Sequence, residues 1–327
     1  MIIDILLFIV SLIAIIKGAD FMTDGSAAVA HRYGISTMVI GMTIVAVGSS
    51  APELVVSALA SVKGNTDMAI GNVVGSNIFN ILAIIGVTAL LSPITTSRNN
   101  VRNDVPFVVL SSIVIAITAL DSIFSSGSEN IISRSEGMLL LCMFAIFLSY
   151  TFAMAKDNNG KEEATTLSED VKKMKTWKSI LFIIGGLSAL IFGGNILVKS
   201  ASSIASQLGV SQSIIALTIV SIGTSLPELA ASAIAARKGD SAMALGNVVG
   251  SAVFNVFFIL GLSATISPLS LGNITIIDIM TLILASCLFW LFTKTHLEVK
   301  KWEGVILIIV QILYYIYLIT NATTEIN

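Results

Sequence analysis

Charged residues are scarce in this chain. Asp, Glu, Lys and Arg make up 12% of its 327 residues, whereas a soluble domain carries about 25%. They are concentrated in short polar stretches between long apolar blocks, and 55% of all residues are hydrophobic. An apolar block of about 20 residues is long enough to span a bilayer as a helix. The composition therefore excludes an ordinary soluble domain and predicts an all-α polytopic membrane protein.

Cysteine and histidine are nearly absent too. Cys142 and Cys287 both lie inside apolar runs, and we expect each to be a small buried hydrophobic residue, not half of a disulfide or a metal ligand. His31 and His296 lie away from the polar motifs described below, which argues against a zinc or copper site. The net charge of −2 gives no indication of a nucleic-acid partner.

The apolar blocks predict ten transmembrane spans. The first block ends in Lys17-Gly18-Ala19-Asp20 and has no small-residue cleavage site, so we interpret it as a span and not as a signal peptide. Trp177 and Trp302 open the sixth and tenth spans, as expected for aromatic residues at the membrane interface. The predicted spans are residues 2–19, 35–61, 68–91, 104–121, 137–155, 177–198, 210–236, 242–266, 274–293 and 302–320.

The distribution of Lys and Arg predicts the orientation. If the N-terminus is outside, every Lys and Arg faces the cytoplasm except Lys63, Arg134 and Lys199, with Lys17 undecided. Because cytoplasmic loops carry an excess of Lys and Arg, both termini are expected outside and the polar loop 156–176 in the cytoplasm. We therefore expect a multi-pass protein of the cell membrane.

The chain also contains an internal repeat. Residues 41–80 align without a gap with residues 216–255, and more than half of the aligned residues are identical. Five spans per copy place the second copy in the membrane upside down, which is the inverted repeat of many secondary transporters. The predicted organisation is a first repeat at 1–155, a linker at 156–176 and a second repeat at 177–327. A duplication with a purely structural role is the alternative, but the similarity is concentrated in polar intramembrane residues.

Each copy carries the same polar motif inside an apolar span. The first copy reads Gly48-Ser49-Ser50-Ala51-Pro52-Glu53, and the second reads Gly223-Thr224-Ser225-Leu226-Pro227-Glu228. A proline inside a helix removes a hydrogen bond and clashes with the preceding turn. We therefore expect broken helices at the membrane midplane, near Pro52 and Pro227.

The helix breaks suggest how the motif could bind cations. Ser50 and Ser225 are expected to cap the second half-helix, as the serine of a capping box S-x-P-E. The end of the first half-helix would leave backbone carbonyls without partners, and their partial negative charge suits cations. The carbonyls concerned lie around Ala46 and Ser49 and around Ser221 and Thr224.

Glu53 and Glu228 place two carboxylates at membrane depth. Such a group is costly there and indicates function. A structural alternative is a glutamate that is protonated or neutralised by a basic partner. However, Lys63 and Lys238 lie only at the far ends of these spans, so a mobile cation is the better explanation.

A second motif follows in both copies. It reads Gly71-Asn72-Val73-Val74-Gly75-Ser76-Asn77-Ile78-Phe79-Asn80, and its counterpart occupies residues 246–255. The glycines form a small-xxx-small pattern that allows close helix packing. Ser76 and Asn80 share one helix face, as do Ser251 and Asn255, and we expect these faces to line the site. Carboxylate, hydroxyl, amide and carbonyl oxygens form a ligand set that suits Ca²⁺ and, by size, Na⁺.

The two motifs resemble the α-repeats of the cation/calcium exchanger superfamily, specifically its prokaryotic sodium/calcium exchanger branch. The resemblance covers essentially the whole chain. It implies a secondary antiporter that exports Ca²⁺ in exchange for Na⁺ by alternating access, with no cofactor beyond the transported ions. The oligomeric state is left open by the sequence, and a monomer is compatible with it.

The resemblance also implies roles for individual residues. Glu53 and Glu228 would be central ligands shared by Ca²⁺ and Na⁺, and Ser49 and Thr224 would serve the central and flanking sites. One Na⁺ position would be surrounded by Ala46, Ser50 and Ser76, its symmetric counterpart by Ser221, Ser225 and Ser251, and the middle would be lined by Asn80 and Asn255.

Two residues depart from the family pattern. Some similar exchangers carry Asp at the position of Asn255, so this site offers two formal charges, not three. Ser49 stands where Thr is commoner in the family, but it retains the hydroxyl. The alternatives that stay open are an H⁺/Ca²⁺ antiporter and a K⁺-dependent Na⁺/Ca²⁺ exchanger. A channel would not need two matched inverted half-sites, and no HExxH, Ser/His or Cys/His set at membrane depth suggests an enzyme.

Overall fold

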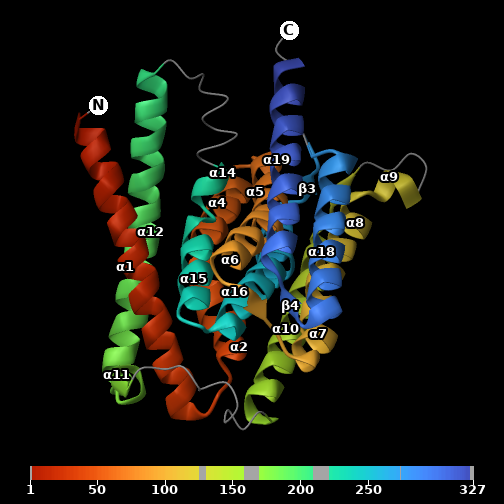
Figure 1. The fold of residues 1–327 in the computed structure, drawn as a ribbon. Coiled ribbons are helices and arrows are strands. Elements are labelled where there is room, and N and C mark those ends of the chain that lie inside the picture. Colours follow the sequence, from red (N-terminus) through yellow and green to blue (C-terminus); the bar gives the residue numbers. More distant parts are fainter. Residues whose placement is uncertain (1, 125–129, 158–168, 209–220, 273, 325–327) are drawn as a thin grey trace.

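The computed structural model describes residues 2–124, 130–157, 169–208, 221–272 and 274–324. Most of these residues are helical (Figure 1). Within the described ranges, eight helices are long and apolar enough to cross a membrane, and one bent helix pair is a ninth candidate. The polytopic all-helical class is therefore confirmed. The seventh predicted span, 210–236, begins in residues that lie outside the described ranges.

The first half of the chain forms the following helices. They are α1 (Ile2–Tyr33), α2 (Thr37–Ile40), the π-helical η1 (Gly41–Val45), α3 (Ala46–Ser49), α4 (Ala51–Val62), α5 (Thr66–Phe79), the π-helical η2 (Asn80–Ile84), α6 (Ile85–Leu91), α7 (Arg98–Asn103), α8 (Val105–Ala119), α9 (Asp121–Phe124) and α10 (Arg134–Asp157).

The second half repeats this pattern in its described part. It contains α11 (Glu169–Lys172), α12 (Thr176–Gln207), α14 (Ser221–Gly223), α15 (Leu226–Arg237), α16 (Ser241–Val253), the π-helical η4 (Phe254–Leu260), α17 (Gly261–Ile266), α18 (Ile276–His296) and α19 (Lys301–Thr324). The strands are β1 (Ile94–Thr95), β2 (Ile131–Ile132), β3 (Leu269–Ser270) and β4 (Glu298–Val299).

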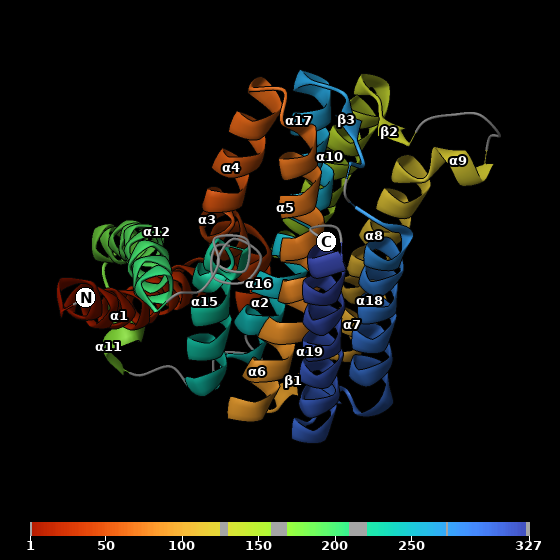
Figure 2. The ribbon, with the colours of Figure 1, turned by 90° about the horizontal axis from the view of Figure 1, so that it is seen from above.

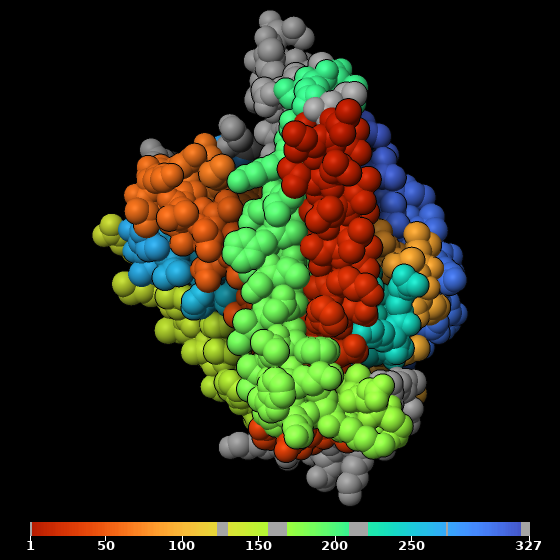
Figure 3. Space-filling view, turned by 90° about the vertical axis from the view of Figure 1, so that its left-hand side faces the viewer, coloured from red at the N-terminus to blue at the C-terminus, as the bar shows by residue number. Residues whose placement is uncertain are grey.

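The two longest helices, α1 and α12, form a pair beside the other helices. They lie next to each other and run in opposite directions (Figures 1 and 2), and together they cover one face of the molecule (Figure 3). Each has 32 residues, which corresponds to about 48 Å of helix. Both helices extend beyond the predicted spans 2–19 and 177–198. Their close packing continues past residue 19, because a Cβ atom on Gly25 would lie only 2.7 Å from the Ser179 carbonyl oxygen.

The most buried spans are Thr66–Leu91 and Ser241–Ile266, one from each half. The outer helices instead expose large apolar side chains, as expected for a surface that faces lipid. Cys142 and Cys287 are free cysteines on this exposed surface. Their predicted burial was wrong, because an apolar run in a membrane protein can face lipid as well as a core.

Short contacts join the two halves. β1 pairs with β4 and β2 pairs with β3, in both cases antiparallel, so loops of one half are fastened to loops of the other. Two tyrosine–aspartate hydrogen bonds occupy related places in the two halves. The Tyr150 hydroxyl donates to Asp104 Oδ1 at 2.6 Å, and the Tyr314 hydroxyl donates to Asp278 Oδ1 at 2.8 Å. The first bond ties α10 to the start of α8, and the second ties α19 to the first turn of α18.

Candidate ion-binding site

Both predicted helix breaks are present. α3 ends at Ser49 and α4 begins at Ala51, with a bend of 50° between the flanking helices. In the second half, α14 ends at Gly223 and α15 begins at Leu226. The proline of each motif lies in the first turn of the new helix. Backbone N–H groups there have no acceptor within the helix, so the missing N–H of proline costs no hydrogen bond. The glutamate follows in the same turn, near the positive end of the helix dipole.

The serines at the breaks do not cap their own helices, so the predicted capping boxes were wrong. Ser50 and Ser225 stand at the N-cap positions without a side-chain cap hydrogen bond. Instead, the Ser50 hydroxyl donates to Glu228 Oε1 at 2.7 Å, and the Ser225 hydroxyl donates to Glu53 Oε1 at 3.1 Å. A hydrogen bond to a buried carboxylate is stronger than one to a backbone amide. Each glutamate is thus held by the hydroxyl of the other copy.

The predicted free carbonyl of Ala46 is also not observed. Its oxygen accepts the Ser50 backbone N–H at 3.0 Å and the Ser49 hydroxyl at 3.3 Å. The π-helical segment η1 ends at Val45, next to Ala46. The backbone hydrogen bond from Ser50 to Ala46 therefore forms after the π-helical segment and reaches the break. The second-copy counterpart, Ser221, begins α14, and its side chain lies outside the described part of the structure.

Glu53 and Glu228 are both fully buried, with 0% exposure. Neither forms an ion pair with any described residue. In each glutamate, one carboxylate oxygen accepts the crossed serine hydrogen bond, while Oε2 has no hydrogen-bond partner in the described structure. Two buried carboxylates without a counter-charge are unfavourable, and a bound cation would offset that cost.

Further buried polar atoms without partners belong to the same motifs. The described residues provide no hydrogen bond to Thr224 Oγ1, Ser251 Oγ, Asn255 Oδ1 or either side-chain polar atom of Asn80. The packing brings them towards the glutamates, since η2, which begins at Asn80, contacts α15, and η4, which includes Asn255, contacts α4. Buried polar groups are normally satisfied, so this concentration of unpaired polar atoms points to a ligand.

The remaining predicted residues lie close to these groups. Ser49 and Ser50 are adjacent at the first break and fully buried. Ser76 is buried, with 4% exposure, in α5 one turn before Asn80, and Ala46 is fully buried. The structure therefore places the described members of the predicted set in and around the two breaks. Their function as ion ligands stays a prediction.

Sequence reasoning missed two asparagines that position the glutamates. Asn72 Nδ2 donates to the Glu53 carbonyl at 3.3 Å and to Ser57 Oγ at 2.9 Å. Asn247 Nδ2 donates to the Glu228 carbonyl at 3.2 Å and to Ser232 Oγ at 2.8 Å. Their equal positions in the two copies of an intramembrane motif were the signal that could have identified them.

The chemistry of the site is that of oxygen ligands. It offers carboxylate, hydroxyl and amide oxygens, the ligands preferred by hard cations. Among the residues that the structure describes, no group of three or more His, Cys, Asp or Glu side chains could hold a metal ion. The site thus has two formal charges surrounded by neutral oxygens, which differs from the ligand sets of transition-metal centres.

A cavity of about 330 Å³ leads to one side of the site. It lies between α4, α12 and the second helix break, and it reaches Pro52, Thr224 and Pro227. Asn195 and Val198 of α12 also line it. The cavity therefore extends along the α4–α12 boundary to residues at both helix breaks.

Comparison with known proteins places this architecture in a family. The family model described as "Sodium/calcium exchanger protein" matches residues 3–153 and again residues 178–320. The chain belongs to the sodium/calcium exchanger family. Proteins of this family are membrane transporters, so this exchanger-family chain is a transporter and not an enzyme.

Relatives of the exchanger are found in bacteria and archaea. CaxA of Alkalimonas amylolytica is 39% identical over 270 residues, which cover 82% of each chain. The sodium/calcium exchanger MaX1 of Methanosarcina acetivorans is 31% identical over an alignment that covers 97% of this chain and 98% of MaX1.

A solved structure shares the fold of the exchanger. The sodium-calcium exchanger NCX_Mj, in crystals soaked with 2.5 mM Na⁺ and 0.1 mM Ca²⁺, superposes with a TM-score of 0.79 and 30% sequence identity. The superposition covers 98% of both chains. The overall fold is therefore that of a known exchanger structure.

Proposed function

We propose that this protein is a secondary antiporter that exchanges Ca²⁺ for Na⁺ by alternating access and exports Ca²⁺ from the cell. The observation that carries the proposal is the pair Glu53 and Glu228. Both are fully buried and lack a basic partner within the described structure, and each keeps one carboxylate oxygen free. MaX1 and NCX_Mj, which cover nearly the same length, are named as exchangers of these two ions.

In this proposal the two glutamates are the central ligands for Ca²⁺. The neighbouring hydroxyls and amides supply neutral oxygens to Ca²⁺ or to Na⁺ in the flanking positions. The proposed neutral ligands are Ser49, Ser50, Thr224, Ser225, Ser76, Ser251, Asn80 and Asn255, together with backbone groups at Ala46 and Ser221. The Ala46 carbonyl would exchange the Ser49 hydroxyl for the ion. The free oxygens of Thr224, Ser251, Asn80 and Asn255 support this assignment.

The formal charge of the proposed site equals that of one Ca²⁺. Asn80 and Asn255 are neutral, so Glu53 and Glu228 alone balance the divalent ion. If more than two Na⁺ ions replace one Ca²⁺, each cycle moves net charge across the membrane. One net charge corresponds to about 2.3 kcal/mol per 100 mV, so a negative interior would favour Ca²⁺ export.

We further propose ten spans arranged as two inverted repeats in the cell membrane, with the termini outside and the loop 156–176 in the cytoplasm. The two segments that match the family model agree with a first repeat at 1–155 and a second at 177–327. The crossed bonds Ser50–Glu228 and Ser225–Glu53 support a pseudo-symmetric pair of half-sites. In this orientation, the cavity between α4 and α12 faces the outside.

Transport by the purified protein in liposomes tests the function. Liposomes loaded with Na⁺ and diluted into Na⁺-free medium with ⁴⁵Ca²⁺ should accumulate Ca²⁺. Loading with K⁺ alone, or applying a proton gradient without Na⁺, should give no uptake above empty liposomes. A K⁺ diffusion potential, positive inside, should speed uptake that exports more than two Na⁺ for each Ca²⁺, because net positive charge then leaves the liposome.

Other outcomes of this experiment would replace the proposal. Uptake driven equally by a proton gradient without Na⁺ would identify an H⁺/Ca²⁺ antiporter. A requirement for K⁺ together with Na⁺ would identify a K⁺-dependent exchanger.

A further inference from the structure

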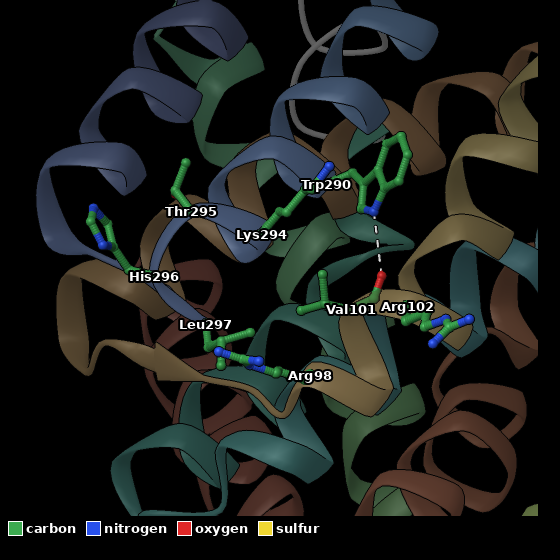
Figure 4. Close-up of a pocket in the computed structure, with 8 residues that line it drawn as sticks. All are labelled: Arg98, Val101, Arg102, Trp290, Lys294, Thr295, His296 and Leu297. Atoms are coloured by element: carbon green, nitrogen blue, oxygen red, sulfur yellow. Dashed lines mark hydrogen bonds between the residues drawn. The ribbon is translucent and has the colours of Figure 1, made fainter.

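A second polar cavity lies at the other side of the molecule from the α1–α12 pair. It has a volume of about 610 Å³ and lies between α7 and the C-terminal end of α18 (Figure 4). We call it the basic pocket, and it is lined by Arg98, Val101, Arg102, Trp290, Lys294, Thr295, His296 and Leu297. Half of these residues are Arg, Lys or His, and none is acidic. Its size is that of a typical small-molecule site.

The fold builds this pocket from two helix ends. Arg98 and Arg102 are one turn apart on α7 and therefore share a face. On α18, Lys294 lies in the last turn, and Leu297 adopts a left-handed conformation with φ 55° that turns the chain into β4. Because β4 pairs with β1, just before α7, the two helix ends are fastened together.

Trp290 forms a wall of the basic pocket. Its indole Nε1 donates a hydrogen bond to the Val101 carbonyl at 3.3 Å, which ties α18 to α7. Lys294 Nζ lies 5.6 Å from the centre of the Trp290 ring, at cation–π distance. Trp290 thus positions the Lys294 ammonium group, while the tryptophan itself stays 38% exposed.

The positive charges of the basic pocket are not neutralised by the described protein. Arg98, Arg102 and Lys294 form no ion pair with any residue in the described ranges. Lys238 offers a contrast within the same molecule, because it contacts two aspartates. Basic groups gathered without a carboxylate repel one another, and an anion that enters the pocket would relieve this repulsion.

The position along α18 suggests which anion it is. The basic pocket lies where the apolar span Ile276–His296 ends, which is the depth of lipid headgroups. Leu284 and Leu291 on the same helix are 51% and 52% exposed, so an apolar surface adjoins the pocket. In the proposed orientation this end of α18 faces the cytoplasmic leaflet, where anionic lipids meet basic pockets between helices.

We propose that the basic pocket binds the phosphate headgroup of an anionic phospholipid from the cytoplasmic leaflet. Arg98 and Arg102 contact the phosphate from α7, and Lys294 contacts it from α18. The acyl chains follow the exposed apolar surface of α18. This site is separate from the ion-binding glutamates, and it does not depend on which ion drives transport.

Quenching of Trp290 fluorescence by brominated lipid tests the proposal in the full chain. The substitutions Trp177→Phe and Trp302→Phe leave Trp290 as the sole tryptophan, because the chain has 3. The protein is reconstituted with brominated phosphatidylglycerol or brominated phosphatidylcholine. We expect phosphatidylglycerol to quench at a roughly tenfold lower mole fraction than phosphatidylcholine, since Lys and Arg near the membrane surface attract anionic lipid. Equal quenching by the two lipids would overturn the proposal.

Two variants separate a defined site from general attraction to a negative surface. Arg98→Gln with Arg102→Gln should abolish most of the preference for phosphatidylglycerol. Lys173→Gln with Lys175→Gln removes the same charge from exposed positions elsewhere and should preserve it. An equal loss in both double variants would show that the pocket is not a site. If the arginine variant does not fold, the lipid comparison in the single-tryptophan protein still decides the question.

The source of the phosphate needs its own control. Inorganic phosphate in millimolar excess should leave the quenching by brominated phosphatidylglycerol unchanged. Displacement by inorganic phosphate at a concentration comparable to that of the lipid would mean that the pocket takes a free anion, and the lipid proposal would fail.

Discussion

The two copies of the repeat surround their glutamates in the same way but differ in how they contact the α1–α12 pair. At the end of α15, Lys238 Nζ lies 2.6 Å from Asp20 and 2.8 Å from Asp24 of α1. The first-copy counterpart, Lys63 at the end of α4, forms no ion pair with a described residue. By the alignment of the copies, the residues of α12 that correspond to the two aspartates are Asn195 and Lys199.

This difference agrees with the positions of the cavities. The cavity between α4 and α12 reaches Pro52 and Thr224 at the breaks. On the other side, a cavity of about 310 Å³ between α1 and α15 is lined by Ile16, Asp20, Ile234, Arg237 and Lys238, and so does not include the break residues. Among the described residues, a cavity thus reaches the helix breaks on the side of Lys63, whereas the cavity on the side of the Lys238 ion pairs does not.

The largest effect on transport is expected from substituting either glutamate. The two copies contribute one carboxylate each, so both substitutions should have effects of similar size. Glu53→Gln or Glu228→Gln should each lower Na⁺-driven ⁴⁵Ca²⁺ uptake by roughly 100-fold or more, since an uncompensated charge in a buried site costs about 3 kcal/mol or more. Thermal stability in detergent should not fall, because a buried charge is removed. Glu169→Gln, at a carboxylate that is 71% exposed, is the control. Near-normal uptake by either glutamate variant would contradict the site assignment.

A smaller effect is expected from the crossed hydroxyls. Ser50→Ala and Ser225→Ala each remove a hydrogen bond to the glutamate of the other copy. Hydrogen bonds to charged groups contribute about 1.5–3 kcal/mol, so the Ca²⁺ concentration at half-maximal uptake should rise roughly tenfold in both variants. Ser188→Ala, which removes an exposed hydroxyl bonded within α12, should have no effect. A large effect from one serine alone would mean that the half-sites are not equivalent.

These serines also show where prediction from the sequence stops. The sequence predicted both helix breaks, because a proline inside an apolar span has a strong local consequence. It also predicted the membrane class from composition. The S-x-P-E pattern, however, indicated a local cap, and the hydroxyls instead bond to glutamates in the other copy. A partner that lies far away in the sequence is fixed by packing, which a local pattern does not contain.

Other errors have the same origin. The lengths of α1 and α12 depend on their mutual packing, so apolar runs alone ended them too early. The π-helical segments η2 and η4 adjoin Asn80 and Asn255, and no residue preference marks such segments. By contrast, Asn72 and Asn247 could have been assigned, because both are polar, intramembrane and equivalent in the repeat.

A moderate effect is expected from Lys238. Within the proposed alternating access, its ion pairs stabilise the state that is open to the outside. The three side chains are about one-third exposed, so each pair contributes only about 0.2–1 kcal/mol. Lys238→Met should therefore raise the external Ca²⁺ concentration for half-maximal transport by roughly two- to fivefold, because fewer molecules are open outwards.

Lys63→Met is the matched control, since it removes the equivalent lysine without breaking an ion pair among the described residues. In oriented membrane vesicles, this variant should leave the external Ca²⁺ concentration for half-maximal transport unchanged. If both lysine variants shift this value equally, the difference between the two sides of the α1–α12 pair does not control access.

The smallest effect concerns the caps of the two central spans. Asp240 caps α16, and its Oδ1 accepts the Met243 N–H at 2.9 Å and the Thr37 hydroxyl at 2.8 Å. Its first-copy counterpart, Asn65, caps α5 and is exposed. Burial raises the pKa of Asp240 above its ordinary value. The folded state thus favours the protonated carboxyl, and stability should fall as pH rises from about 4 towards the raised pKa.

The substitution Asp240→Asn keeps a side-chain oxygen that can accept the Met243 N–H. It removes the titrating carboxyl, and with it the pH dependence of stability. Its melting temperature in detergent should match the parent near pH 4 and exceed it by a few degrees at pH 7, an effect of about 1 kcal/mol or less. The reciprocal change, Asn65→Asp, places a charge at an exposed helix N-terminus and should be nearly neutral at both pH values. A melting temperature for Asp240→Asn that falls below the parent at pH 7 would show that the ionised carboxylate of Asp240 stabilises the second copy, unlike the neutral cap of the first.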